Sequence, residues 1–232
     1  TEIYTLSLHD ALPIYLFYQT YGNGRHDAIC HAVSQDGLTF TRNPGNPVFR
    51  PAGSWTCGRA IDADVVVQDG TLLLYFATRD PAMKVQMLGV ACAPVDSDFS
   101  PAVWRQRCDG PILRPELAWE QDCIEAPAVG AHGGRLFMFY GGAYNNAPQQ
   151  IGVASSLDGL RWERVSATPF LPNGAPGSWN SCESGHPFVF TDNDGTTHLF
   201  FQGNDDKGRT WHLSRRQVDW HDGLPVLAPA AP

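Results

Sequence analysis

Short apolar runs alternate with polar turns along the whole chain. Four segments each hold a strand rich in Leu, Phe and Tyr, then a polar turn and a second strand. They read YLFYQTYGNGRHDAICHAVSQDGLTF, DGTLLLYFATRDPAMKVQMLGVACAP, GGRLFMFYGGAYNNAPQQIGVASSLDGLRW and DGTTHLFFQGNDDKGRTWHLSRRQVDW. The aromatic strand recurs at Tyr18, Phe76, Tyr140 and Phe201, at intervals of about 60 residues. A repeat of this length with several strands per unit is typical of a β-propeller blade.

The pattern between the strands indicates an all-β chain with at least four blades. No long amphipathic helical pattern separates the strands, which disfavours a parallel α/β architecture. The 23 glycines and 18 prolines suit many short strands joined by tight turns. Residues 15–232 are therefore interpreted as one propeller domain. DWHDGLPVLAPAAP at the end of the sequence is expected to close blade four.

Charge and composition exclude several classes of partner. The net charge of −8 argues against binding to nucleic acid. No apolar run approaches the roughly 18 residues needed to cross a membrane. The six cysteines are scattered without a CxxC pair, which argues against a zinc site. An even number of cysteines permits disulfides, but small buried thiols are the simpler interpretation.

Two repeats share the motif S-x-D-G-x-x-[FW]. It reads SQDGLTF from Ser34 and SLDGLRW from Ser156. Asp-Gly within such a stretch is a tight-turn signal. We therefore interpret the motif as a turn that folds an aromatic ring onto its blade, with no catalytic role.

Candidate site residues stand where blades two, three and four open. The openings read AIDADVVVQDG, CIEAPAVGAHGG and CESGHPFVFTDNDG, and place Asp64, Glu125 and His186 before runs that enter the sheet. Their distances to the following aromatic strand are 8, 11 and 11 residues. Similar offsets in a rotational repeat predict that the three side chains surround one axis. The alternative is that each residue caps a turn or pairs with Arg59 or Arg79.

These openings resemble the motifs of the five-bladed propeller glycosidases of glycoside hydrolase family 43 and the related families 32 and 117. DADVVVQDGTLLLYFAT resembles the motif in which an Asp tunes the acid, CIEAPAV the general-acid motif, and ESGHPFVF the channel-histidine motif. The resemblance covers about Tyr15 to Trp220 and implies a five-bladed fold. It departs from the family where Ile61-Asp62-Ala63 replaces the usual Trp-Ala-Pro.

The resemblance implies Glu125 as general acid and Asp64 as its tuning neighbour. Residues expected to contact substrate are His186, Asp62, Arg59, Arg79, Glu183 and Trp179. The implied reaction is inverting hydrolysis of O-glycosidic bonds in plant or algal polysaccharides, of the arabinoside or xyloside type. In it a carboxylic acid protonates the leaving oxygen and a second carboxylate activates water. No cofactor is required, although family members hold a metal ion or ordered water near this histidine, so a Ca²⁺ ion near His186 is compatible. The family also implies a carbohydrate partner and a secreted or periplasmic parent.

The family's general base is an Asp at the start of blade one, and the repeat predicts its position. Aligning Ile14 with Leu72 places the base between Ile3 and Leu6, where no residue carries a carboxylate. Asp10 lies too close to the register point to take that place. Residues 1–14, TEIYTLSLHDALPI, resemble the in-frame translation of a common sequencing-library adapter. We therefore expect residues 1–14 to be a passenger segment and the base to be missing from this chain.

Two other classes of function compete with the enzyme. A carbohydrate-binding propeller would keep the channel without the chemistry, and the candidate sugar-stacking rings are Trp55, Trp119, Tyr144 and Trp179. A protein-interaction propeller would not need Asp64, Glu125 and His186 on one axis. The mutual distances of these three side chains discriminate between the hypotheses.

Overall fold

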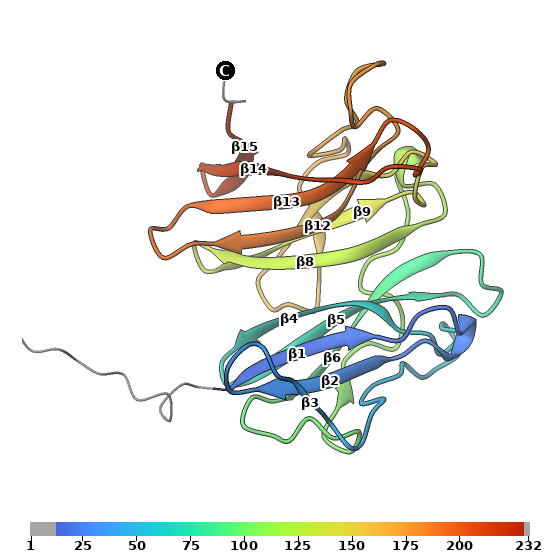
Figure 1. The fold of residues 1–232 in the computed structure, drawn as a ribbon, viewed down its shortest axis with the longest axis vertical. Coiled ribbons are helices and arrows are strands. Elements are labelled where there is room, and N and C mark those ends of the chain that lie inside the picture. Colours follow the sequence, from blue (N-terminus) through green and yellow to red (C-terminus); the bar gives the residue numbers. More distant parts are fainter. Residues whose placement is uncertain (1–12, 230–232) are drawn as a thin grey trace, which may run out of the picture.

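The computed structural model describes residues 13–229, and within that range the chain forms four antiparallel sheets and two short 3₁₀ turns (Figure 1). Blade one holds β1 (Ile14–Gln19), β2 (Ile29–Ser34) and β3 (Thr41–Arg42). Blade two holds β4 (Ile61–Gln68), β5 (Thr71–Arg79), β6 (Gln86–Pro94) and β7 (Arg105–Gln106). Blade three holds β8 (Ile124–His132), β9 (Arg135–Gly142), β10 (Gln150–Ser156) and β11 (Glu163–Arg164). Blade four holds β12 (Glu183–Thr191), β13 (Thr197–Asn204), β14 (His212–His221) and β15 (Leu224–Leu227).

This arrangement confirms the predicted all-β fold and the predicted blade openings. The 3₁₀ turns are η1 (Gly24–His26) and η2 (Ala118–Glu120). The C-terminal stretch supplies β15, which closes blade four as expected. All six cysteines are free. None of the helical turns in the described range is long and apolar enough to cross a bilayer.

The hydrophobic core lies between consecutive blades. One buried cluster joins blades one and two around Phe49, Phe76 and Trp104. A second joins blades two and three around Tyr75 and Met138, and a third joins blades three and four. Apolar side chains alternate along each strand, so each sheet presents a face to both of its neighbours. The blades are therefore held mainly by burial of these faces, and not by hydrogen bonds from one blade to the next.

Blade one begins, within the described residues, at the position that the second strand holds in the other blades. Ile14 pairs with Ser34 as Leu136 of β9 pairs with Ser156. The register point used to locate the base, Ile14, is therefore equivalent to the start of β9. The inner-strand position of blade one would fall on residues before Ile14. The predicted base position between Ile3 and Leu6, Asp10 and most of the passenger segment lie outside the described residues, and only Pro13 and Ile14 of that segment fall within them.

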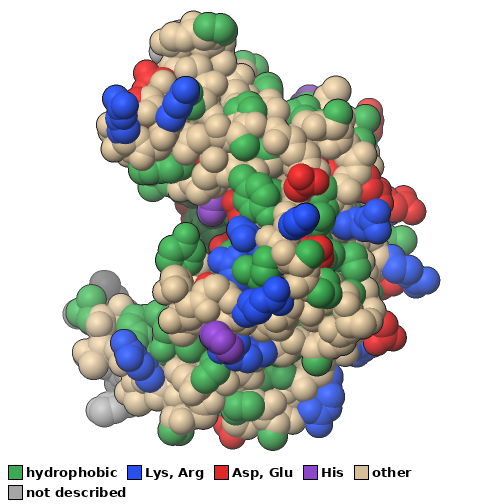
Figure 2. All heavy atoms as spheres, turned by 90° about the vertical axis from the view of Figure 1, so that its right-hand side faces the viewer, with side chains coloured by type: hydrophobic (Ala, Val, Ile, Leu, Met, Phe, Trp, Pro, Cys, Tyr) green, Lys and Arg blue, Asp and Glu red, His purple; other side chains and the backbone are tan. Residues whose placement is uncertain are grey.

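The ring of blades is open on one side. The first described strand of each blade packs on that of the next, in the order β1, β4, β8 and β12, but among the described residues no comparable packing joins β12 to β1. Apolar side chains are exposed on both margins, with Ile14 48% and Leu16 42% exposed on β1, and Phe188 54% and Phe190 46% on β12. Figure 2 shows a deep notch between the upper half of the molecule, which carries blade four, and the lower half, which carries blade one. The described fold is thus a partial propeller.

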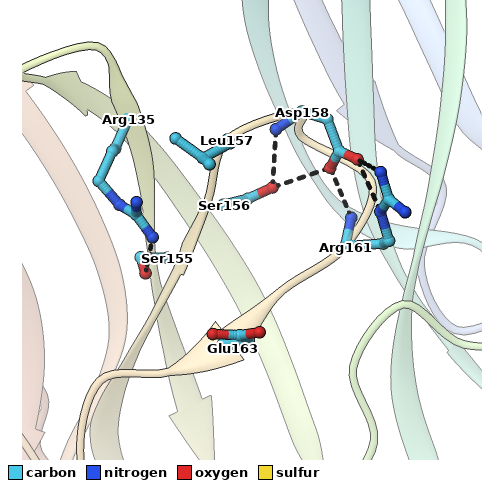
Figure 3. Close-up of a pocket in the computed structure, with 7 residues that line it drawn as sticks. All are labelled: Arg135, Ser155, Ser156, Leu157, Asp158, Arg161 and Glu163. Atoms are coloured by element: carbon cyan, nitrogen blue, oxygen red, sulfur yellow. Dashed lines mark hydrogen bonds and ion pairs between the residues drawn. The ribbon is translucent and has the colours of Figure 1, made fainter.

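The S-x-D-G motif forms the predicted turn, as Figure 3 shows for blade three. The Asp158 carboxylate accepts hydrogen bonds from the backbone N–H of Leu160 and Arg161, and Ser156 Oγ accepts from the N–H of Asp158 and Gly159. Ser34 and Asp36 repeat the arrangement in blade one. These backbone bonds lower the pKa of Asp36 to about 2.

The aromatic ring at the end of the blade-three motif packs across the blade boundary. Trp162 is buried and donates its indole N–H to the Gly159 carbonyl at 3.1 Å. Its ring meets Tyr75 of blade two edge to face, with ring centroids 5.6 Å apart. Tyr75 in turn donates its hydroxyl to the same Gly159 carbonyl. The turn therefore locks blade three against blade two, a role that the sequence pattern had assigned only within one blade.

Asp158→Ala should destabilise the folded chain by about 1–2 kcal/mol, because two backbone N–H groups and the Ser156 hydroxyl lose their acceptor. Arg161→Ala is the matched control, since Arg161 is exposed and only forms a surface ion pair with the same carboxylate. Its cost should stay below about 0.5 kcal/mol. Urea unfolding followed by tryptophan fluorescence measures both. Equal costs for the two variants would contradict the turn as a stabilising element.

Candidate active site

A β-bulge interrupts the inner strand of each of blades two, three and four. The register breaks lie between Ile61 and Asp64, between Glu125 and Ala128, and between Gly185 and Phe188. Within each break one residue has positive φ: Asp62 at 53°, Ala126 at 49° and His186 at 45°. Positive φ is costly for a residue with a side chain and is found where the surrounding fold imposes it. The bulge is thus a repeated device that turns side chains out of the sheet.

The bulges bring Asp62, Glu125 and His186 together. One side-chain ligand atom from each of the three lies within 4.8 Å of the other two. His186 Nε2 is 3.8 Å from Glu125 Oε1. The backbone N–H of Ala126 donates to the Asp62 carboxylate at 3.3 Å, and Asp62 accepts no other backbone bond from blade three. The cluster therefore joins the inner strands of three blades.

The predicted set of three differs from this cluster in one member. The offsets of 8, 11 and 11 residues do not describe equivalent positions in the three blades. Asp64 follows the bulge of its strand, Glu125 precedes the bulge of its strand, and His186 lies within its bulge. Asp62 and His186 are the equivalent pair. Asp62 had been assigned to substrate contact, and the structure places it beside Glu125.

Asp64 lies between blades two and three. Its carboxylate accepts a 2.7 Å hydrogen bond from the backbone N–H of Val129 in β8. Burial is the main cause that raises the pKa of Asp64 to about 7, against the opposing effect of the Val129 and Val65 amides. Asp64 is therefore a carboxyl group that can gain or lose a proton near neutral pH. It directly follows the bulge that holds Asp62.

Amide side chains from two blades hold the Glu125 carboxyl group. Gln149 Nε2 donates to Oε1 at 2.7 Å, and Gln86 Nε2 donates to Oε2. Gln149 Oε1 also accepts the backbone N–H of His186 at 3.0 Å. A further glutamine, Gln19 of blade one, accepts the backbone N–H of Asp62. The orientation of the Glu125 carboxyl plane is thus fixed by its neighbours.

These glutamines escaped the sequence analysis, although the repeat carries a signal for two of them. Gln86 begins QMLGVA and Gln149 begins QQIGVA, and both sequences occupy the same register against the preceding aromatic strand. A polar residue repeated before an apolar strand was a recognisable pattern. The role of these glutamines could not be predicted from the pattern, because their two amides approach one carboxylate from different blades.

Burial raises the pKa of Glu125, and the neighbouring Asp62 carboxylate raises it further. His186 and the Gln149 amide oppose this effect without reversing it. Burial likewise raises the pKa of Asp62, opposed by His186 and by the Ala126 amide. Two carboxyl groups at this distance cannot both ionise cheaply. The cluster therefore favours keeping a proton on one of them.

Glu183 and Gln202 support His186 from blade four. Gln202 Nε2 lies 2.9 Å from His186 Nδ1 and donates to Glu183 Oε1 at 2.9 Å. With the amide in this orientation Nδ1 is an acceptor, so the ring proton sits on Nε2 and faces Glu125. Glu183 is fully buried, and burial raises its pKa. Its oxygens are both engaged, since the Asn146 N–H donates to the second.

The two predicted arginines lie behind the cluster. Arg59 is buried and forms an ion pair with Asp27 at 3.3 Å, and it donates to Gln86 Oε1 at 3.2 Å. Arg79 donates to the same oxygen at 2.8 Å. Neither guanidinium pairs with Asp64 or Glu125, in contrast to the alternative considered from the sequence. Both act on Gln86, whose amide nitrogen then points at Glu125.

The candidate sugar-stacking rings have different surroundings. Trp119 stacks on Tyr140 and donates to the Ala167 carbonyl, so it belongs to the packing between strands. Trp179 is 38% exposed and lies against Phe201. The Arg79 guanidinium lies over the Tyr144 ring, 5.1 Å from its centroid. Trp179 is therefore the exposed ring of these three, whereas Tyr144 and Trp119 are half-buried and held by their neighbours.

The cluster is a poor match for the Ca²⁺ ion considered from the family resemblance. Ca²⁺ takes six to eight oxygen ligands. The cluster offers two carboxyl groups and one imidazole nitrogen, and both Glu125 oxygens already accept amide hydrogen bonds. These residues do not fit a calcium ion, and no step of the chemistry below depends on a metal.

The partial propeller has counterparts among solved structures. No family model matches the chain. A thermostable family-43 glycoside hydrolase has the same fold, with a TM-score of 0.75 and 22% identity over 95% of this chain and 73% of that one. An endo-1,4-β-xylanase from Bacteroides thetaiotaomicron gives a TM-score of 0.73 and 21% identity over 94% of this chain and 71% of its own.

One curated relative is similar in sequence. It is alpha-L-arabinofuranosidase 43 of Humicola insolens, 25% identical over 152 residues, which are 60% of this chain and 30% of the relative. The chain thus spans less than a third of the length of that protein. Together with the solved structures, this similarity confirms the predicted resemblance to the family-43 propeller enzymes.

Asp64→Asn should stabilise the fold at pH 8 and leave it nearly unchanged at pH 4. A pKa raised to about 7 means that the folded state holds the Asp64 proton more tightly than the unfolded chain, so wild-type stability falls as pH rises from about 4 to about 7. The asparagine removes that loss, which is about 4 kcal/mol. Urea unfolding at both pH values measures the difference. A benefit that is the same at pH 4 and pH 8 would contradict a buried, proton-holding Asp64.

Proposed function

We propose that the parent protein is an inverting glycoside hydrolase and that Glu125 is its general acid. The observation that carries the proposal is the position of Glu125. It is buried, oriented by two amides and close to Asp62 and His186 on the axis of a partial propeller. A carboxyl group with a raised pKa in such a setting can hold a proton at neutral pH and release it to a leaving oxygen.

In the proposed reaction the Glu125 O–H gives its proton to the glycosidic oxygen as the bond from that oxygen to the anomeric carbon breaks. Water attacks the anomeric carbon from the opposite face, and a base takes the proton that the water loses. Glu125 ends as a carboxylate and regains its proton from solvent. Burial and the Asp62 carboxylate keep the pKa of Glu125 high before proton transfer, and the Nε2 proton of His186 then stabilises the carboxylate that forms.

The base is the part that we propose is missing from this chain. The register point Ile14 is equivalent to Leu136, which supports the sequence alignment that places the base between Ile3 and Leu6. Those positions carry no carboxylate. Asp62 lies within 4.8 Å of Glu125, which leaves no room for a sugar and a water between the two. Asp64 is engaged by the Val129 amide between blades two and three, and its raised pKa keeps a proton on it near neutral pH. We expect negligible hydrolysis by the chain alone.

The substrate class we propose is an arabinoside or xyloside linkage in a plant or algal polysaccharide. The names of two similar proteins, an arabinofuranosidase and a xylanase, support this class. Exposed Trp179 and half-buried Tyr144, which lies under Arg79, supply ring surface on which a sugar can stack, in agreement with a carbohydrate substrate.

Glu125→Gln should slow the hydrolysis of substrates whose leaving group requires a proton. An arabino-oligosaccharide needs its leaving oxygen protonated, so turnover should fall by about 10²–10⁴-fold. A p-nitrophenyl arabinofuranoside carries a leaving group that departs without a proton, so its turnover should fall far less. Both are measured at pH 7 in a version of the enzyme that carries a blade-one carboxylate. An equal loss on both substrates would remove Glu125 from the acid role, and Glu183 would be the next candidate.

Added formate should raise hydrolysis of the p-nitrophenyl substrate by this chain, because a small carboxylate can take the place of the absent base. The rate is followed at constant ionic strength with chloride as the control anion. We expect a dependence on formate concentration and none on chloride. Hydrolysis that is already rapid without formate would show that the chain contains its own base, and a chain that binds sugar without any formate-dependent turnover would favour the binding-propeller alternative.

A further inference from the structure

A second cavity lies between blades two and three, outside the axial cluster. It has a volume of about 460 Å³, within the range of small-molecule sites. Trp55, Val85 and Met87 contribute apolar surface, and Asp80, Arg114 and Asp122 contribute charge. The segment around Leu113 frames one side through its backbone pairing with Leu88 of β6.

The cavity and the cluster share one stretch of backbone. Gln86 points its amide at Glu125, whereas its neighbours Val85 and Met87 line the cavity, because side chains alternate across a strand. The Gln86 N–H also bonds the carbonyl of Asp122, which lines the cavity three residues before Glu125. The cavity is therefore close to the axial cluster but separated from it by β6, so a ligand within it does not reach the reacting bond.

The tryptophan in the wall of this cavity has an unused hydrogen-bond donor. Trp55 packs over Gly89, as Trp119 packs over the equivalent Gly152 in blade three. Trp119 donates its indole N–H to the Ala167 carbonyl. The Trp55 indole N–H is buried and finds no acceptor among the described residues. Because this N–H is enclosed, the part of Trp55 that a ligand in the cavity can contact is its apolar ring surface.

The chemistry of the cavity favours a neutral sugar. Two carboxylates and one guanidinium give the lining a negative balance, which disfavours a phosphate, a sulfate or an acidic sugar. An aromatic ring beside aliphatic side chains suits the C–H face of a sugar ring, and the charged rim can bond its hydroxyls in both directions.

We propose that this cavity is a secondary, non-catalytic site for a sugar unit of a polysaccharide chain. The inference rests on the proposed function for the identity of the polymer, but not on catalysis at Glu125. Occupation of the cavity holds the polymer near the axial cluster, so the chain binds the polymer more tightly than it binds short fragments.

The test is affinity electrophoresis of the purified chain through gels that contain soluble arabinoxylan or linear arabinan. The double variant Arg114→Ala with Asp122→Ala removes one positive and one negative exposed side chain from the rim. We expect its apparent affinity for the retarding polymer to fall about tenfold, the effect of losing one or two hydrogen bonds to the sugar.

The matched control is Arg135→Ala with Glu163→Ala. It makes the same change of charge in a cavity of about 370 Å³ beside the Ser156 turn, shown in Figure 3. It should migrate as wild type does. Retardation of the rim variant equal to that of wild type, or no retardation of any protein by either polymer, would overturn the proposal. Failure of the proposed catalysis is recognised separately, because it appears in the turnover of Glu125→Gln and leaves the electrophoretic result unchanged.

Discussion

The geometry of the site depends on one constraint: the Glu125 carboxyl group is gripped by amides that belong to different segments of the ring. Gln149 reaches it from its own blade and Gln86 from blade two. Gln86 is itself held by Arg59 and Arg79. Burial of a carboxyl group without hydrogen-bond partners would destabilise the fold, so the burial of Glu125 requires these amide hydrogen bonds. Docking of blade two on blade three is therefore a condition for the acid to have a defined orientation.

That docking depends on shape as much as on polar contacts. Gly89 and Gly152 stand opposite aromatic residues in the sheet, and a side chain at either would meet a ring, with Phe76 atoms 2.4 Å from a Cβ at Gly89 and Tyr140 atoms 2.5 Å from one at Gly152. Each glycine also receives the edge of a tryptophan from the preceding loop. The missing Cβ is what lets the tryptophan approach the strand next to the positioning glutamine. Packing and polar positioning are thus encoded in one short sequence, Q-x-[LI]-G-V-A.

The sequence predicted the blades well because their cause is local. Alternating apolar positions and Asp-Gly turns specify each hairpin, so the strand pairs, the blade openings and the closing role of the C-terminal stretch could be anticipated. It predicted Glu125 and His186 for the same reason, since each stands where a polar residue meets an apolar run. The bulges could not be anticipated, because a register break depends on pairing with the next strand. Counting residues along the chain therefore gave Asp64 a place in the cluster that the fold gives to Asp62.

The remaining gap in prediction concerns partners distant in the sequence. Asp27 with Arg59 and Gln86 with Glu125 have no pattern that links them in the chain, because the packing of one blade on the next brings them together. Single residues such as Arg79 were foreseen near the site, but their action through Gln86 was not. A sequence repeat predicts the position of a residue within its blade, but it does not predict which residue of the next blade it contacts.

The repeated bulge has a consequence for how such proteins diversify. Each inner strand presents one residue within its bulge, which is Asp62 in blade two, Ala126 in blade three and His186 in blade four. The three differ in charge and size, yet the backbone around them is the same and the buried faces between blades do not involve them. Exchange at these positions alters the chemistry of the axis while the scaffold keeps its packing. Duplication of a blade therefore adds one axial residue that can vary without disturbing the packing of the core. The reaction can then diverge faster than the fold.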